Sequence, residues 1–204
     1  MIHYHVDVGD LTEIERALGM QKDKSKQVLK AAINDTVKET DKLLANEANK
    51  RYYIKKTKVK KTLSKKKATV SKLEGLVTSV GGANELYDYK VTPRAYNPHN
   101  RPKAGHKGNV NRMNQAKNLY LRPGQKDQYK AFVVKYKSGH VAIAQRVPGT
   151  RMRNKPNKEA LKNLLSLSTP KLLGEEQGVY GVVEPQMYDI LEQSIERELQ
   201  RILR

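Results

Sequence analysis

Two segments of this chain combine a dense run of lysine and arginine with a complete lack of acidic residues, so both should form surface rather than core. The first runs from Arg51 to Thr69 and the second from Arg94 to Lys126. Nine basic residues occupy the first: Arg51, Lys55, Lys56, Lys58, Lys60, Lys61, Lys65, Lys66 and Lys67. Eight occupy the second: Arg94, Arg101, Lys103, Lys107, Arg112, Lys117, Arg122 and Lys126.

These nine and eight residues supply 17 charges of the formal +19, which leaves the rest of the chain nearly neutral. Mutual repulsion makes such a concentration unfavourable unless a partner neutralises it. We therefore predict that the 17 residues form a partner-binding surface. The partner could be nucleic acid, a membrane surface or an acidic protein ring.

Composition limits the remaining possibilities. A chain of 204 residues can form one large or two small domains, and we predict one domain over 1–204. The sequence has no cysteine and no Trp, so disulfides and thiolate metal sites are excluded and the core should be aliphatic. The start MIHYHVDVGD resembles no signal peptide, and no apolar stretch is long enough to cross a membrane. We expect a soluble protein without a membrane partner.

The N-terminal third predicts a strand followed by helices. Residues 1–8 alternate apolar and polar side chains, as in a half-buried strand, and a capping pattern at Asp10 predicts a short helix ending near Gly19. A long amphipathic helix is expected over 23–49, with an apolar stripe formed by Val28, Leu29, Ala32, Ile33, Val37, Leu44 and Ala48. A short helix over 57–64 should follow within the first basic segment.

The middle of the chain predicts strands separated by an arm. Weak strand patterns occupy 68–80 and 87–92. From Pro93 to Gln125 the periodicity disappears among prolines and glycines, and we predict an extended basic arm over 93–127 that becomes ordered only on assembly.

The clearest strand signal is a hairpin of residues 129–136 and 141–147 around a turn with Gly139. Phe132 and Val134 should meet Val141 and Ile143 across it, at the centre of the sheet.

The last element is an amphipathic helix over 185–204, with Pro185 at its first position. Together these elements predict an α+β fold. A small, mostly antiparallel sheet should be packed by the helices over 23–49 and 185–204, with the basic arm inserted between strands.

Candidate catalytic groups are weak. His3 and His5 share one strand face but have no third metal ligand in view. His99, His106 and His140 have no carboxylate nearby in sequence to orient them, so we expect polar surface residues there rather than general bases. Acidic residues at Glu175, Glu176, Glu184 and Asp189 are explained by the start of the last helix. No nucleotide-binding, nucleophile-elbow or zinc-protease motif occurs. We expect no enzyme activity and no catalytic, cofactor or metal site.

Three stretches, taken in order, resemble the minor tail protein Z family of long-tailed bacteriophages, also described as tail completion proteins. The first is KAAINDTVKETDKLLANEANKRYYIKKTKVKKTLSKKKAT over 30–69, with Ala32, Asn34 and Thr36 as the small-residue motif of a long helix. The second is the hairpin AFVVKYKSGHVAIAQRV. The third is LKNLLSLSTPKLLG with the terminal helix, over 161–204. The chain has Ser166, Leu167 and Ser168 where the family often has a Gly-Pro-Ser turn.

This resemblance implies a non-enzymatic virion component at the head-proximal end, or neck, of the tail, made in the cytoplasm of a bacterial host. It implies assembly with copies of itself as a ring, with a hexamer favoured. Further partners would be the tail terminator, tail tube or head-tail connector, whose acidic surfaces would complement the lysines. Transient contact with genomic DNA would also fit.

Two other classes stay open. A nucleic-acid-binding protein would contact DNA phosphates through Lys55–Lys67 and the 94–126 segment, with affinity that falls steeply as salt rises. A nuclease or other enzyme would need an activity that depends on His3, His5 or a carboxylate.

Overall fold

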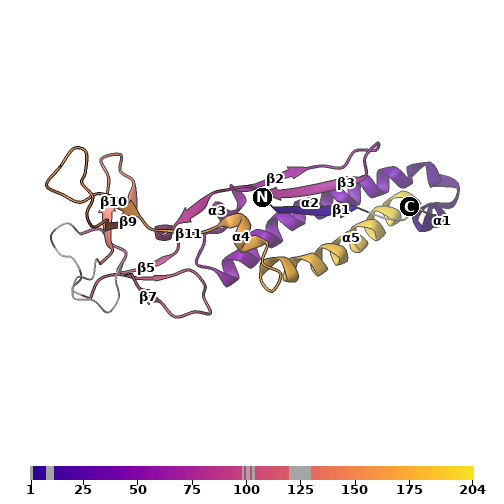
Figure 1. Cartoon of the computed structure of the whole chain (residues 1–204). Helices are drawn as coiled ribbons and strands as arrows, with labels where there is room; N and C mark the ends of the chain where they lie inside the picture. The colour runs from indigo at the N-terminus through magenta and orange to yellow at the C-terminus, as the bar shows by residue number, and fades with distance from the viewer. Residues whose placement is uncertain (1, 8–11, 98, 100–101, 103, 120–129) are drawn as a thin grey trace. The chain divides into compact units, whose positions relative to one another are not determined.

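The computed structural model describes residues 2–7, 12–97, 99, 102, 104–119 and 130–204. Helices and small antiparallel sheets alternate along the chain, which confirms the α+β class (Figure 1). The chain divides into two compact units. Unit 1 comprises Met1–Asn49, Lys56–Gly82 and Thr169–Arg204, and unit 2 comprises Lys50–Lys55 and Ala83–Ser168. The chain passes between them four times, and the single domain predicted above stays a prediction.

Unit 1 contains most of the helices. They are α1 (Thr12–Leu18), a 3-10 turn (Gly19–Lys24), α2 (Ser25–Arg51, which ends in unit 2), α3 (Lys56–Lys60), α4 (Thr169–Leu173) and α5 (Val179–Leu203). Its sheet has the order β1-β3-β2, formed by β1 (Ile2–Asp7), β2 (Leu63–Lys66) and β3 (Glu74–Ser79). The predicted short helix therefore ends early, and its last two positions, Leu63 and Ser64, are strand paired with β3.

The apolar stripe of α2 forms the centre of unit 1. Every residue predicted for that stripe is buried: Val28, Leu29, Ala32, Ile33, Val37, Leu44 and Ala48. Strand β3 crosses it so closely that a Cβ on Gly75 would lie 2.8 Å from Ile33 Cγ2 and would also collide with Val37. Only glycine fits there, because a methyl group would occupy space that the helix side chains already fill.

The motif at Ala32, Asn34 and Thr36 has a packing role at each position. Ala32 is fully buried, and the buried Thr36 hydroxyl donates a 2.9 Å hydrogen bond to the Ala32 carbonyl. Asn34 binds the backbone of Ala68, accepting from its N–H at 2.8 Å and donating to its carbonyl at 3.3 Å. Polar side chains are stable in this position because each has a partner.

Helix α5 begins earlier than predicted. Pro185 lies inside the helix, which starts at Val179, so its placement at the first helical position is wrong. Val179 and Val183 are buried and extend the apolar stripe toward the N-terminus, so packing overrides the proline signal. Further along, Ile195, Leu199 and Ile202 pack on the cluster formed by Ile14, Leu18, Val28 and Leu29.

Unit 2 is built mainly from strands. These are β4 (Ala83–Glu85), β5 (Lys90–Thr92), β6 (Lys107–Asn109), β7 (Lys117–Asn118), β8 (Phe132–Lys135), β9 (Val141–Arg146), β10 (Leu161–Asn163) and β11 (Leu165–Ser168), with a 3-10 turn at Leu86–Asp88. They form three sheets with the orders β10-β9-β8, β11-β4 and β5-β6-β7. With that of unit 1, the described residues hold four small sheets where one was expected.

The predicted hairpin is present, but its cross-strand partners differ. Phe132 pairs with Ala144 and Val134 with Ala142, while Val133 pairs with Ile143. Val133 and Ile143 are both buried, whereas Phe132 and Val134 are half-buried. A shift of one residue in register moves every side chain to the other face, and the turn alone did not fix that register.

The expectation that 93–127 lacks regular structure is wrong at β6 and β7, which pair with each other and join the sheet of β5. Gly108 in β6 is buried against Leu86 and Leu119. These strands are two or three residues long, too short for their alternation to be visible in sequence. Residues 98, 100–101, 103 and 120–127 of the predicted arm lie outside the described part of the chain.

Candidate polyanion-binding surface

The two units differ strongly in charge. Unit 2 contains 21 Lys and Arg against four Asp and Glu, a formal net charge of +17. Unit 1 contains 19 Lys and Arg against 17 Asp and Glu, a net charge of +2. The surplus charge therefore belongs to one structural unit rather than to the two sequence segments that predicted it.

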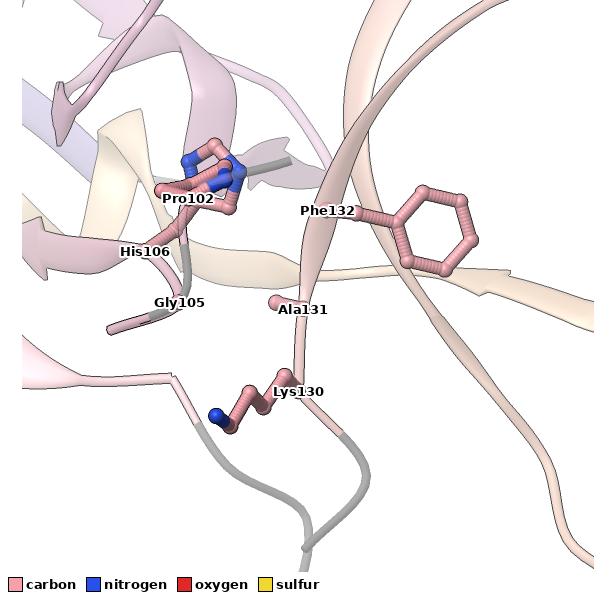
Figure 2. Close-up of a pocket in the computed structure, with 6 residues that line it drawn as sticks. All are labelled: Pro102, Gly105, His106, Lys130, Ala131 and Phe132. Atoms are coloured by element: carbon pink, nitrogen blue, oxygen red, sulfur yellow. The ribbon is translucent and has the colours of Figure 1, made fainter. Parts of the chain in front are cut away.

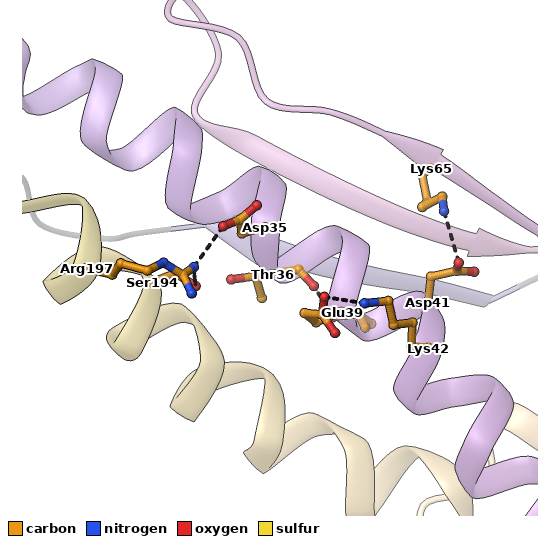
Figure 3. Close-up of polar contacts among 9 residues, drawn as sticks. Asp35, Thr36, Glu39, Asp41, Lys42, Lys65, Ser194 and Arg197 are labelled. Atoms are coloured by element: carbon orange, nitrogen blue, oxygen red, sulfur yellow. Dashed lines mark hydrogen bonds and ion pairs between the residues drawn. The ribbon is translucent and has the colours of Figure 1, made fainter. Parts of the chain in front are cut away.

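The first basic segment is divided between the units. Arg51 and Lys55 belong to unit 2, whereas the seven lysines from Lys56 to Lys67 belong to unit 1. There, Lys65 lies opposite the buried Val77 across the β2–β3 pair and forms a 3.0 Å ion pair with Asp41 of α2 (Figure 3). Five of these seven lysines lie in α3 or in the edge strand β2, where lysine also protects a sheet edge from pairing with other chains.

The second basic segment lies entirely in unit 2. Arg94, Lys107, Arg112 and Lys117 are exposed. Arg101, Lys103, Arg122 and Lys126 lie outside the described residues. Eleven further basic residues of unit 2 fall outside both predicted segments, and all but Arg146 are exposed: Lys50, Lys90, Lys130, Lys135, Lys137, Arg146, Arg151, Arg153, Lys155, Lys158 and Lys162. They are spread over strands and turns outside the two segments, and Arg151, Arg153, Lys155 and Lys158 lie between β9 and β10.

Backbone hydrogen bonds join the start of the first segment to the middle of the second. The Arg112 N–H donates to the Arg51 carbonyl at 2.8 Å, and the Tyr53 N–H donates to the Val110 carbonyl at 2.9 Å. Between them, Tyr52 and Asn111 form an antiparallel bridge. Residues nearly 60 positions apart in sequence are thereby held side by side.

Tyr53 lies where residues 51–53 meet residues 110–112, and two cations lie over its ring. The Arg112 guanidinium carbon lies 4.4 Å from the ring centroid and the Lys90 Nζ lies 5.0 Å from it. Each distance is within the range of a cation–π interaction. We call Tyr53, Lys90 and Arg112 the Tyr53 cluster. Lys90 was missed from the sequence because it stands alone on β5, and only the fold brings it to Tyr53.

Two further cations lie on β6 or just after β5, the strand that carries Lys90. Lys107 shares a sheet face with Lys90, because Thr92 lies opposite Lys107 and two residues from Lys90. The Arg94 guanidinium carbon lies 4.3 Å from the Tyr87 ring centroid, and its Nη1 donates to the Tyr89 carbonyl at 2.8 Å. Arg94 is thus held in place while it stays exposed.

A second polar network occupies the end of the β8–β9 hairpin. His140 Nε2 lies 3.0 Å from Glu85 Oε2, and Asn163 donates to Glu85 Oε1 at 3.3 Å. The Tyr136 ring stacks on that of His140, and its hydroxyl donates to Asn163 Oδ1 at 2.5 Å. Burial, together with the Glu85 carboxylate, raises the pKa of Tyr136. His140 therefore has an orienting carboxylate after all, 55 residues away in sequence.

The other histidines differ from their predicted roles in one respect. His106 is buried, contrary to the expectation of a surface residue, and its Nδ1 lies 2.8 Å from the Pro93 carbonyl oxygen. Nδ1 of the exposed His3 lies 3.1 Å from the Thr78 hydroxyl oxygen. Within the described residues, no three His, Asp or Glu side chains gather in a way that could hold a metal ion.

A pocket of about 230 Å³ opens beside His106 and Lys130 in unit 2 (Figure 2). Pro102, Gly105, Ala131 and Phe132 complete its lining. Its volume is below the roughly 300–1,000 Å³ of ordinary small-molecule sites. Its few polar groups make it a minor feature beside the charge of unit 2.

The carboxylates of the C-terminal region are held within unit 1. The Tyr180 hydroxyl donates a 2.5 Å hydrogen bond to Glu184 Oε1, one turn along α5, and this bond raises the pKa of Tyr180 to about 12. Glu175, Glu176 and Asp189 are exposed.

Comparison with protein-family models, curated proteins and solved structures finds no match. Among the described residues, none of the helices combines the length and the apolar character needed to cross a membrane. Arguments about function therefore depend on the chain's own residues.

Proposed function

We propose that this protein is a structural component of a bacteriophage virion, a tail completion or minor tail protein that caps the head-proximal end of the tail and helps to join it to the head. Its role is assembly rather than catalysis, and its place is the neck of the particle. It is made in the cytoplasm of the bacterial host.

The observation that carries the proposal is that, of the three stretches which resemble the family, the third contacts each of the other two within a unit. In unit 1, Arg197 of the third stretch donates a 2.8 Å hydrogen bond to Asp35 of the first (Figure 3). In unit 2, β10 of the third stretch pairs with β9 of the second, and Leu164 N–H donates to the Ile143 carbonyl at 2.9 Å. Segments that resemble a family in order and also pack together support a shared fold more strongly than separate matches do.

The proposed partners follow from the same role. Copies of the chain assemble as a ring, with a hexamer favoured, and the ring contacts the tail terminator, tail tube or head-tail connector. Long-range attraction between the positively charged chain and acidic surfaces of these neighbours steers the association.

Deleting the coding sequence from the phage genome tests the role. Negative-stain images should then show tails of normal length that fail to attach to heads, and supply of the protein from a plasmid should restore joined particles. Purified wild-type virions should contain the chain by mass spectrometry. Normal joined particles without it would reject the proposal.

A further inference from the structure

We propose that unit 2 binds nucleic-acid phosphates through a surface centred on the Tyr53 cluster, without reading base sequence. This binding activity goes beyond the proposed assembly role and does not depend on it. Unit 2 contains 21 basic and four acidic residues, a net charge of +17, and a surface with so large an excess of positive charge attracts a dense polyanion.

A second copy of the chain is too weakly acidic to be that polyanion. Unit 1, the other surface that a copy offers, carries 19 basic and 17 acidic residues, so its net charge is +2. Its most acidic stretch, from Glu175 to Glu196, holds six carboxylates and no Lys or Arg, which is about a third of the charge that unit 2 presents. Duplex DNA carries about one negative charge per 1.7 Å of its axis, a density high enough to neutralise the positive charge of unit 2.

Residue types favour nucleic acid over an acidic protein. Lysine, which is depleted at protein–protein interfaces, supplies 13 of the 21 cations of unit 2. Aromatic residues, which anchor such interfaces, are here engaged by cations: Tyr53 by Lys90 and Arg112, and Tyr87 by Arg94. A mixed set of lysine and arginine at an exposed surface is typical of phosphate contacts.

The geometry also indicates the mode of binding. Arg94 and Arg112 lie over aromatic rings that restrict their rotamers, so less conformational entropy is lost when they bind a phosphate. The same contacts occupy the Tyr53 and Tyr87 rings, so these two rings are not open for bases to stack on. Contacts should therefore be made to the backbone, with duplex bound at least as tightly as single strands and with no sequence preference.

The experiment measures fluorescence anisotropy of a labelled 30-base-pair duplex of arbitrary sequence with the full chain, between 50 and 300 mM salt. The wild type should bind with a micromolar or lower Kd at 100 mM salt, and log Kobs should fall linearly with log salt. The test variant is Lys90→Glu with Arg94→Glu and Arg112→Glu. We expect its Kd to rise at least tenfold and the salt slope to shrink by about 2 to 3.

The matched control changes the same number of charges in unit 1, as Lys60→Glu with Lys61→Glu and Lys66→Glu, all at exposed positions. Its Kd should rise less than threefold. Equal weakening in both variants would reject the Tyr53 cluster as the centre, because net charge alone would then explain binding. Failure of the wild type to bind at 100 mM salt would reject the activity.

Two further arms complete the test. Poly-glutamate at the same charge concentration should compete at least tenfold less well than unlabelled duplex, and equal competition would assign the surface to acidic proteins instead. If the charge-reversal variant fails to fold by circular dichroism, the glutamine versions of the same three positions replace it, with an expected rise in Kd of at least threefold. No rise with a folded glutamine variant would overturn the proposal. Neither result alters the outcome of the deletion experiment.

Discussion

The two units differ in how their basic side chains are balanced by other groups. Unit 1 has nearly balanced charge and forms ion pairs across its elements, such as Lys65–Asp41 and Arg197–Asp35. Unit 2 has few carboxylates, and three of its cations, Lys90, Arg94 and Arg112, lie over tyrosine rings. The lysines of α3 and β2 therefore belong to a unit of nearly balanced charge, whereas the cations of unit 2 have few carboxylates within their own unit.

Core truncation should give the largest effect and tests whether the two units unfold together. Leu29 is fully buried in the cluster of unit 1, so Leu29→Ala should lower the free energy of unfolding by about 3 kcal/mol. Urea denaturation, followed by circular dichroism and tyrosine fluorescence, measures it. Under the single-domain prediction both probes change together.

The matched control for that truncation is Leu203→Ala, because Leu203 is 55% exposed near the end of α5, and it should cost less than about 0.5 kcal/mol. Two separate transitions, only one of them shifted by Leu29→Ala, would show that the units are independent domains.

Alkaline pH should affect unit 2 next most strongly. Burial raises the pKa of Tyr89 to about 12, above the ordinary value of about 10 that applies in the unfolded chain. The neutral phenol therefore contributes stability that is fully present below about pH 10 and is lost as pH rises toward 12, by about 2 kcal/mol in total. Urea midpoints between pH 8 and 12 measure this loss.

The variant Tyr89→Phe tests whether the Tyr89 hydroxyl causes this alkaline loss of stability. It should be less stable than wild type at pH 8, since it lacks the hydrogen bond to the Leu167 carbonyl, but it should lose less stability on going to pH 12. An alkaline loss of the same size in Tyr89→Phe and wild type would assign the effect to other groups, Tyr180 of unit 1 among them.

A smaller effect is expected at Asn34 of unit 1, whose side chain binds the backbone of Ala68. Asn34→Ala removes both hydrogen bonds to the Ala68 backbone and should cost about 1 to 2 kcal/mol, because a partly buried N–H and C=O lose their partner. Thermal unfolding measures it, with the exposed Asn154→Ala in unit 2 as control. An equal effect at both positions would mean that Asn34 has no special role.

Exposed ion pairs should give the smallest effect in either unit. Arg197 and Asp35 have side chains 61% and 45% exposed, so their coupling in a double-mutant cycle should be at most about 0.5 kcal/mol (Figure 3). The His140–Glu85 pair of unit 2 should be comparably weak, because the His140 side chain is 49% exposed. A coupling above about 1.5 kcal/mol in unit 1 alone would show that its balanced charge contributes to stability directly.

Periodic elements could be predicted from the sequence and irregular ones could not. The stripe of α2 was predicted residue by residue, because helices repeat every 3.6 residues and a long element repeats often enough to be visible. Strands β6 and β7 repeat too little for that. For the hairpin, the sequence indicated both strands but not their register, which depends on how Val133 and Ile143 pack below.

For the candidate surface, the excess of positive charge could be predicted from the sequence, but the positions of the charges in the fold could not. Runs of lysine are visible without a fold, so the segments over 51–67 and 94–126 were found. Lys90 and Tyr87 were not, because a single lysine or tyrosine carries no local signal. The carboxylate of Glu85 was missed as the partner of His140 for the same reason.

By itself, the sequence determined the class of fold, the two principal amphipathic helices and the excess of positive charge, since these depend on composition and on periodicity along a single element. Only the tertiary structure decided which charges lie together. It divided one lysine run between two units and joined residues 51–53 to 110–112 through backbone hydrogen bonds. Contacts between distant segments depend on packing in three dimensions, and no pattern within either segment encodes them.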